Sequence, residues 1–216
     1  MISMKRHKVP KNWPVPRKGT TFVVRPKSNL KDGVPVLVIL RDILKVARTR
    51  KEVKKAIHQK LLLLNAKPVK DERVAAQLFD TLSLVPMKKH YRIVLSENGK
   101  FNVEEISEKE TKQKIAKIVD KKTLKGKKIQ LNLSDGRNFL TDTKCNTNDS
   151  AIINLESKKI EKILELKEKT KAVVIAGKHT GKKGQIEKIK EERKMVGLKV
   201  GNDKLNVLIK QIMVIE

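Results

Sequence analysis

The chain has 216 residues, of which 51 are lysine or arginine and 24 are aspartate or glutamate, so its formal net charge is +27. A compact fold with this charge repels itself unless an anionic partner neutralises it. Nucleic acid is the expected partner, and a membrane surface is the second candidate. We expect neither a membrane span nor a secretory signal, because long apolar runs are lacking and prolines follow the first basic residues.

The cysteine and histidine content excludes the common metal and redox sites. Cys145 is the single cysteine, so an internal disulfide and a cysteine-rich zinc site are both excluded, in keeping with a reducing cytosol. The four histidines, at positions 7, 58, 90 and 179, share no spacing typical of metal ligands. We therefore expect no metal ion and no cofactor.

Aromatic residues make up only 3% of the chain, too few to stack the bases of a single strand. We expect contacts with the phosphates of a folded RNA, recognised by its shape. The charge is also unevenly placed, because residues 1–70 contain 19 basic and three acidic side chains, a net +16. The first third of the chain is therefore the strongest candidate for binding RNA.

Residues 1–34 are predicted to form an extended basic arm. Four prolines, at positions 10, 14, 16 and 26, oppose a helix, and few apolar residues are available for burial. Alone, the arm should be disordered or weakly anchored, and it should become ordered along RNA phosphates. Trp13 is unusual for a solvated tail, which favours a binding role over an inert terminus.

Residues 35–47 are predicted to form a first helix. Apolar side chains recur there at helical spacing, and Pro35 suits the first turn. Arg41, Lys45 and Arg48 lie four and three residues apart, so they would share one face of this helix.

A second helix is predicted to start at Thr49, where Thr49 and Glu52 fit a capping box. Val53, Ala56 and Ile57 would face inward. The basic side of this helix would contain Arg50, Lys51, Lys54, Lys55 and His58. Because residues 35–70 contain only two acids, we interpret the basic faces of both helices as an RNA-binding surface rather than a solvated one.

The remainder of the chain is predicted to be rich in strands. Strands at 61–64 and 81–85 precede a hairpin about Asn98-Gly99. A capped helix is predicted from Ser107 to about Val119. Further strands are predicted at 128–133, 138–141, 151–155, 160–166, 172–176, 185–189, 196–200 and 205–209, several of them joined by glycine-containing turns such as Ser134-Asp135-Gly136 and Gly201-Asn202-Asp203.

Three motifs in this order resemble the archaeal and eukaryotic S4e family of small-subunit ribosomal proteins. The first is Lys5-Arg-His-Lys-Val-Pro-Lys-Asn-Trp13, followed by Arg17-Lys18. The second, an αL-type RNA-binding pattern, runs through Arg41, residues 49–53 and residues 63–69, where Asn65-Ala66 replaces the usual Asn-Gly, so Asn65 should be left-handed. The third is a KOW motif over residues 173–186, with the key glycine at Gly184.

The resemblance covers essentially the whole chain and implies an α+β protein of several domains. These are a basic N-terminal arm (1–34), a small αL-type RNA-binding domain (35–86), a β-rich central domain (87–170) and an SH3-like KOW barrel (171–216). It implies a structural constituent of the small ribosomal subunit, located in the cytoplasm. Its expected partners are small-subunit rRNA and neighbouring ribosomal proteins, with no membrane partner and no homo-oligomer.

The candidate RNA-binding residues follow from this resemblance together with the charge pattern. They are Lys5, Arg6, His7, Lys8, Lys11, Trp13, Arg17, Lys18, Arg25, Arg41, Lys45, Arg48, Thr49, Arg50, Lys51, Lys54, Lys55, His58, Lys67, Lys178, His179, Lys182 and Lys183.

An enzyme is not expected. The loop starting at Gly177 fails the phosphate-loop pattern, because Lys182 stands where the second glycine is required. The carboxylate pairs Glu104-Glu105 and Glu191-Glu192 lie among lysines and are interpreted as solvated charges. The alternative function is a free RNA-binding or polymerase-associated KOW factor outside the ribosome.

Overall fold

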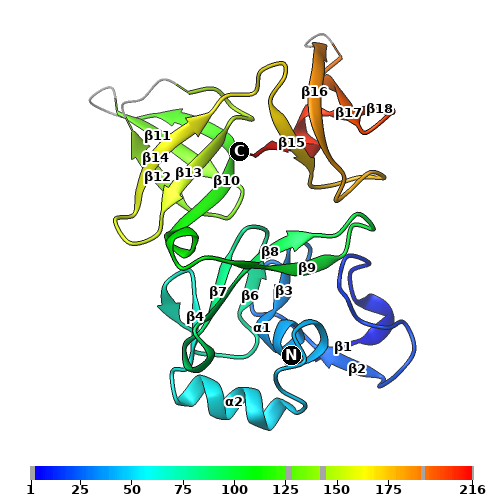
Figure 1. Cartoon of the computed structure of the whole chain (residues 1–216), viewed down its shortest axis with the longest axis vertical. Coiled ribbons are helices and arrows are strands. Elements are labelled where there is room, and N and C mark those ends of the chain that lie inside the picture. Colours follow the sequence, from blue (N-terminus) through cyan, green and yellow to red (C-terminus); the bar gives the residue numbers. More distant parts are fainter. Residues whose placement is uncertain (1–2, 125–127, 142–144, 191–192, 216) are drawn as a thin grey trace. The chain divides into compact units, whose positions relative to one another are not determined.

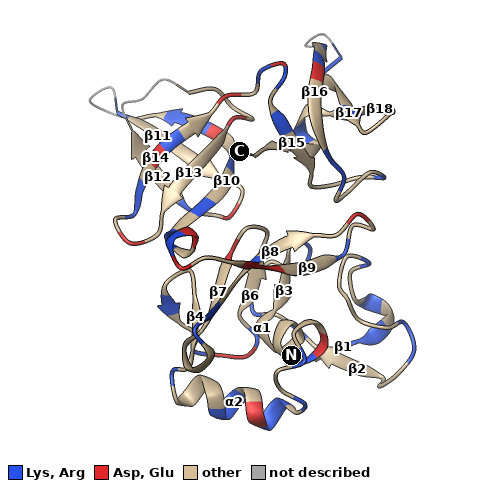
Figure 2. Ribbon diagram, viewed as in Figure 1, with Lys and Arg blue, Asp and Glu red and all other residues tan. Residues whose placement is uncertain are grey.

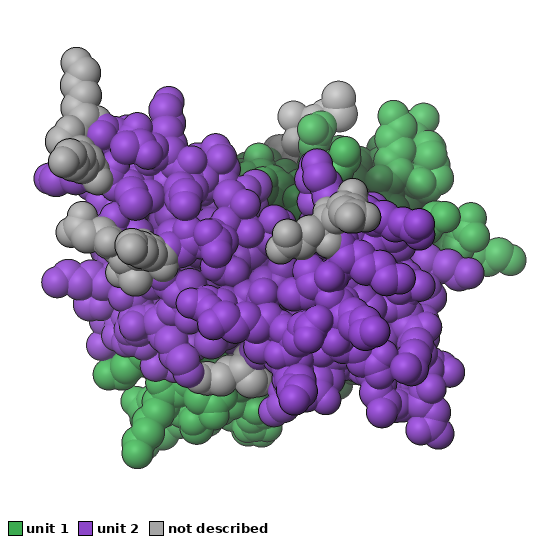
Figure 3. Space-filling model, turned by 90° about the horizontal axis from the view of Figure 1, so that it is seen from above, with its two compact units in different colours: residues 1–96, 100–112 green, residues 97–99, 113–216 purple. Residues whose placement is uncertain are grey.

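The structure is a computed structural model, and it describes residues 3–124, 128–141, 145–190 and 193–215. It contains far more strand than helix, arranged in several antiparallel sheets (Figure 1). The chain divides into two compact units, coloured separately in Figure 3. Unit 1 comprises residues 1–96 and 100–112, and unit 2 comprises residues 97–99 and 113–216.

Unit 1 contains both α-helices and three small sheets. Its helices are α1 (Val36–Val38) and α2 (Arg50–His58). Its strands are β1 (Ser3–Lys5), β2 (Phe22–Val24), β3 (Gly33–Pro35), β4 (Leu62–Leu64), β5 (Lys67–Pro68), β6 (Ala75–Gln77), β7 (Thr81–Leu84), β8 (Lys89–Leu95) and β9 (Phe101–Ile106). β1 pairs with β2, β3 pairs with β6, and the remaining strands form one sheet in the order β5-β4-β7-β8-β9.

Unit 2 contains two five-stranded sheets, each with its own apolar core. The strands of the first, in spatial order, are β12 (Asn138–Thr141), β11 (Ile129–Leu133), β10 (Gln113–Thr123), β13 (Ser150–Asn154) and β14 (Lys159–Leu164). Those of the second are β18 (Asp203–Leu208), β17 (Met195–Val200), β16 (Lys183–Lys190), β15 (Lys171–Val174) and β19 (Ile212–Val214). None of the helices in the described ranges has the length and apolar composition that a membrane crossing demands.

The N-terminal segment is folded, which corrects the expectation of a weakly anchored arm. β1 and β2 pair in antiparallel register, with Met4 opposite Val23. Met4, Trp13 and Val23 belong to the apolar core of unit 1. The indole N–H of Trp13 donates to the carbonyl oxygen of Gly33 at 3.0 Å. These few apolar residues are enough to hold the segment, because each of them reaches a core built from later parts of the chain.

The first predicted helix is shorter than expected. α1 continues into a single π-helical turn over Ile39–Ile43, closed by a hydrogen bond from the Leu44 N–H to the Ile39 carbonyl at 2.9 Å. Lys45 then adopts a left-handed φ of 54°, which ends the helix. Arg41, Lys45 and Arg48 therefore do not share one helical face, contrary to the expectation from their spacing.

The predicted helix over residues 107–119 is wrong. The hydroxyl of Ser107 donates to the Glu110 carboxylate at 3.0 Å, and one short 3-10 helix, Lys109–Lys112, follows. β10 then begins, pairing first with β13 and later with β11. The pairing with β13 and then with β11 provides hydrogen-bond partners for the backbone N–H and C=O groups along β10. This tertiary pairing overrides the local preference for helix.

Candidate RNA interface

Helix α2 presents the clearest cationic surface of unit 1. Thr49 is its N-cap, and the Thr49 hydroxyl accepts a hydrogen bond from the Glu52 N–H at 3.3 Å. The prediction of Thr49 as N-cap and Glu52 at the third helical position is therefore confirmed. The Glu52 carboxylate accepts from the N–H of Arg48, the residue before the N-cap, at 2.8 Å. That backbone hydrogen bond, with one from the Thr49 hydroxyl, lowers the pKa of Glu52. These contacts fix the residue at which α2 begins.

The inward side of α2 is held by Val53 and Ile57, which are both buried as predicted. The outward side consists of exposed residues that lie three and four positions apart: Lys51, Lys54, Lys55 and His58. Figure 2 shows lysine and arginine positions in blue along α2, with one acidic position in red. Within the described ranges, no carboxylate lies within ion-pair distance of Lys51, Lys54 or Lys55. We name Lys51, Lys54, Lys55 and His58 the α2 face.

Arg41 and Arg50 already have carboxylate partners. The Arg41 guanidinium donates to both carboxylate oxygens of Asp42, at 3.0 and 2.8 Å, and these hydrogen bonds raise the pKa of Arg41. The Arg50 Nε donates to Glu72 Oε1 at 2.9 Å, and Glu72 is only 6% exposed. Both guanidinium groups therefore stabilise the fold of unit 1 through charge-assisted hydrogen bonds.

The N-terminal segment divides into one arginine that holds a loop and several exposed cations. Arg6 donates to the carbonyl oxygens of Pro16 and Thr20 and to the Thr20 hydroxyl. The exposed predicted residues are Lys5, His7, Lys8, Lys11, Arg17, Lys18 and Arg25. Trp13 is 1% exposed, so in this conformation its ring packs in the core and is not available to RNA.

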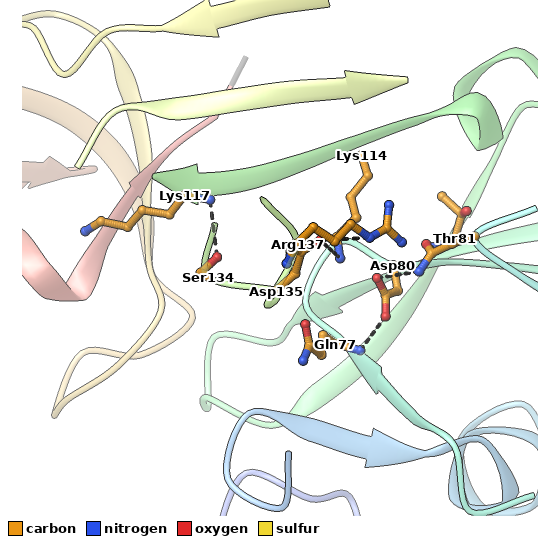
Figure 4. A network of polar contacts seen from close by, with 9 residues as sticks. Gln77, Asp80, Thr81, Lys114, Lys117, Ser134, Asp135 and Arg137 are labelled. Atoms are coloured by element: carbon orange, nitrogen blue, oxygen red, sulfur yellow. Dashed lines mark hydrogen bonds and ion pairs between the residues drawn. The ribbon is translucent and has the colours of Figure 1, made fainter. Parts of the chain in front are cut away.

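The turn between β4 and β5 places Lys67 at the surface. Asn65 and Ala66 both have left-handed φ values, 51° and 61°, so the prediction for Asn65 is confirmed. The Asn65 amide donates to Asp80 at 2.8 Å. The Gln77 N–H donates to the same carboxylate at 2.7 Å (Figure 4). Asp80 thereby holds the turn, a role that its sequence position alone did not reveal.

The glycine-rich loop between β15 and β16 belongs to unit 2. Gly177 and Gly181 have left-handed φ values of 94° and 92°. Lys178 in the loop and Lys183 at the start of β16 are exposed, whereas His179 and Lys182 are half-buried. The geometry leaves these two exposed lysines accessible to an anion.

A polar network in unit 2 was not anticipated from the sequence. Lys114 donates to the Asp135 carboxylate at 2.9 Å, and Asp135 also accepts from the Arg137 N–H at 3.0 Å (Figure 4). Lys117 on the same strand donates to the carbonyl oxygens of Ile209 and Ile212. The cap at Ser107 predicted a helix through this segment, so the partners of Lys114 and Lys117 on other strands could not be identified.

The described residues offer no obvious catalytic centre. Within them, no group of three or more His, Cys, Asp and Glu side chains is placed to hold a metal ion. Cys145 is buried, and desolvation raises the pKa of its thiol, which makes it a poor nucleophile. Glu104 and Glu105 are exposed, whereas Glu191 and Glu192 lie outside the described residues.

Comparison with known proteins agrees with the motifs. The model of ribosomal family S4e matches residues 87–160. Small ribosomal subunit protein eS4 of Methanocella arvoryzae is 36% identical over 193 residues, which cover 88% of this chain and 82% of that protein. The protein of the same name from Nanoarchaeum equitans is 34% identical over 194 residues, covering 86% of this chain and 83% of its own length.

A solved structure supports the same assignment. The crystal structure of the 30S ribosomal protein S4e from Thermoplasma acidophilum superimposes with a TM-score of 0.74 at 26% sequence identity. The superposition covers 86% of this chain and 95% of that one. Sequence, motif order and fold thus agree, and the chain belongs to ribosomal family S4e.

Proposed function

We propose that this chain is a structural constituent of the small ribosomal subunit, where it binds and orders small-subunit rRNA without catalysis. Membership of the S4e family, whose similar members are named as small-subunit proteins, is the observation that carries the proposal. The net charge of +27 requires a polyanion of matching size. Its location would then be the cytoplasm, among rRNA and neighbouring ribosomal proteins.

The proposed domains follow the four parts expected from the sequence. Residues 1–34 would supply the basic segment, residues 35–86 an αL-type RNA-binding domain that includes α2, and residues 87–170 the central domain. Residues 171–216 would form the SH3-like KOW barrel. Five short strands, a glycine-rich loop and an independent apolar core support this last assignment.

The proposed contacts are the lysine, arginine and histidine side chains that are exposed or half-buried and have no assigned role in holding the fold. They are Lys5, His7, Lys8, Lys11, Arg17, Lys18, Arg25, Lys45, Arg48, the α2 face, Lys67, Lys178, His179, Lys182 and Lys183. Arg6, Arg41, Thr49 and Arg50 are assigned to holding the fold, because their polar groups are already hydrogen-bonded within unit 1. Each exposed cation that meets a phosphate releases a counterion, and the released ions supply much of the binding free energy.

The α2 face provides the sharpest test. The variant K51Q/K54Q/K55Q removes three charges without removing any ion pair found among the described residues. We expect its affinity for a small-subunit rRNA transcript to fall about tenfold, and the slope of log K against log salt to shrink by about 2 to 3. The control K158Q/K159Q/K169Q removes three exposed lysines of unit 2 that are outside the proposed contacts. Equal affinity of the two variants would contradict the role of the α2 face.

Fractionation tests the assignment to the ribosome itself. A structural constituent remains with the small subunit through a wash in moderate salt, whereas the alternative KOW factor leaves it or sediments with RNA polymerase. Absence of the chain from washed small subunits would refute the proposed function.

A further inference from the structure

The outer surface of β16, β17 and β18 carries lysines around a glycine. Ile186, Val196, Leu198 and Val207 are buried in the core of this sheet, so the residues that alternate with them face outward. β17 lies between the other two strands, and its central Gly197 is opposite Lys188 on β16 and Asn206 on β18. We name the group around Gly197 the lysine face: Lys188, Lys190, Lys199, Lys204 and Asn206.

The fold of the described residues does not require glycine at position 197. A Cβ built there would lie 3.7 Å from the Lys188 carbonyl and 3.9 Å from the Asn206 side chain, both ordinary contacts. Gly197 also lies outside the group of residues with left-handed φ. At Gly184, by contrast, a Cβ would lie 2.3 Å from the Lys199 carbonyl. A strand-interior glycine weakens its strand by about 0.5–1 kcal/mol relative to alanine, and such a glycine often marks a bulge or the close approach of another molecule. The register shift between Ile186 and Lys188 is on β16, opposite Leu198 and Gly197, so the irregular backbone is that of the partner strand.

The charges of the lysine face are poorly compensated within the sheet. Lys199 is directly opposite Lys204, an arrangement that destabilises an antiparallel pair. Lys204 pairs with Glu187 at 3.2 Å. Over the part of the chain that the structure describes, Lys188, Lys190 and Lys199 have no carboxylate within ion-pair distance. An external anion would relieve this repulsion.

We propose that the lysine face binds the sugar–phosphate backbone of RNA, with Gly197 as the point of closest approach. The proposal rests on the proposed function and adds a second RNA contact, in unit 2, to that of the α2 face. The ammonium groups would contact phosphates on either side of the glycine, and the Asn206 amide is placed to hydrogen-bond a 2′-hydroxyl. The face continues along β16 from Lys183, which is itself a proposed contact.

The charge of the face is tested by K188Q/K190Q/K199Q in the full-length chain. We expect affinity for a small-subunit rRNA transcript to fall about tenfold, with a salt slope smaller by about 2 to 3. The matched control is again K158Q/K159Q/K169Q, which removes the same charge from the same unit outside this face. An unchanged affinity of K188Q/K190Q/K199Q would overturn the proposal.

Gly197 is tested by adding volume without changing charge. G197A should keep or raise the thermal midpoint, because its methyl group would meet no atom closer than 3.7 Å. In G197V the higher strand propensity of valine acts in the same direction. Affinity for the transcript should nevertheless fall, by about tenfold for G197V, since a branched side chain would separate the strand from the RNA backbone. A lower thermal midpoint for G197A would show that the glycine serves the fold, and this would also overturn the proposal.

The outcomes separate this inference from the proposed function. If the wild-type chain fails to bind the transcript, the proposed function itself is wrong. If K51Q/K54Q/K55Q binds weakly while the variants of the lysine face bind normally, only the present inference is wrong. The lysine face would then contact a neighbouring protein and not RNA.

Discussion

The ammonium group of Lys117 on β10 lies 2.6 Å from the carbonyl oxygen of Ile212 at the start of β19, and 2.6 Å from that of Ile209. One side chain thus links the two sheets of unit 2 through backbone acceptors. Lys117 is only 4% exposed. Desolvation by this burial lowers the pKa of Lys117 to about 8, from an ordinary value of 10.5.

The stability of unit 2 should therefore rise with pH between about 8 and 10.5. In this window the unfolded chain keeps the proton on Lys117 while the folded chain has released it, so the free energy of unfolding increases with pH. The full shift corresponds to at most about 3 kcal/mol. Urea unfolding at intervals across the window, compared with K117M, isolates the contribution, because the other lysines titrate in both chains. Parallel stability curves for the two proteins would contradict the lowered pKa.

Removing Arg50 should destabilise unit 1 independently of RNA. R50A leaves the buried carboxylate of Glu72 without its guanidinium partner, and we expect a loss of about 2 kcal/mol in the free energy of unfolding. The double variant R50A/E72Q should recover part of this loss, since the remaining group is neutral. Urea denaturation measures both. If R50A alone unfolds at the wild-type urea concentration, the pair contributes nothing to stability.

The single tryptophan should report a folded N-terminal segment before any RNA is added. Trp13 is buried, so its fluorescence in the full-length chain should be shielded from acrylamide and should shift to the red on unfolding. W13F should cost about 1–2 kcal/mol, because the Gly33 carbonyl loses its donor. Fluorescence as quenchable as that of the urea-unfolded chain would instead support a disordered arm.

The two glycines of the C-terminal sheet should respond in opposite ways to alanine. G184A places a methyl group 2.3 Å from the Lys199 carbonyl, so the paired strands must separate, at a cost of about 2 kcal/mol or more. G197A meets no atom closer than 3.7 Å and should fold normally. Circular dichroism melts of both variants make the comparison, and a G184A melt that overlays the wild type would show that β16 and β17 adjust freely.

Short sequence motifs of two to four residues predicted the local structure correctly. The Thr49–Glu52 capping box starts α2 at the expected residue, and the Asn98-Gly99 turn joins β8 to β9. In both places the deciding hydrogen bonds or dihedral angles lie within the motif. Where distant strands decide, the prediction was wrong. The Ser107–Glu110 cap predicted a helix to about Val119, but residues 113–119 pair with β13 and β11 as part of β10.

The candidate RNA-binding residues show the same difference between what local sequence predicts and what distant contacts decide. The sequence identifies every lysine and arginine, but it does not show which of them are hydrogen-bonded within the fold. Arg41 pairs with its neighbour Asp42, whereas the partners of Arg50 and Arg6 are far along the chain. Arg50 and Glu72 are 22 residues apart, and Arg6 and Thr20 are 14 apart. Trp13 was predicted to bind RNA because tryptophan is unusual in a solvated tail. In the structure its ring is buried in the core, and its N–H donates to the carbonyl oxygen of Gly33, which is 20 residues away.

The anchoring of the N-terminal segment through Trp13 affects the thermodynamics of assembly. Fixing a flexible backbone costs roughly 1–2 kcal/mol per residue, and here that entropy is already lost when the chain folds. In the proposed complex with RNA, the N-terminal segment would dock without folding first. Calorimetry should then record no heat-capacity change from coupled folding of this segment.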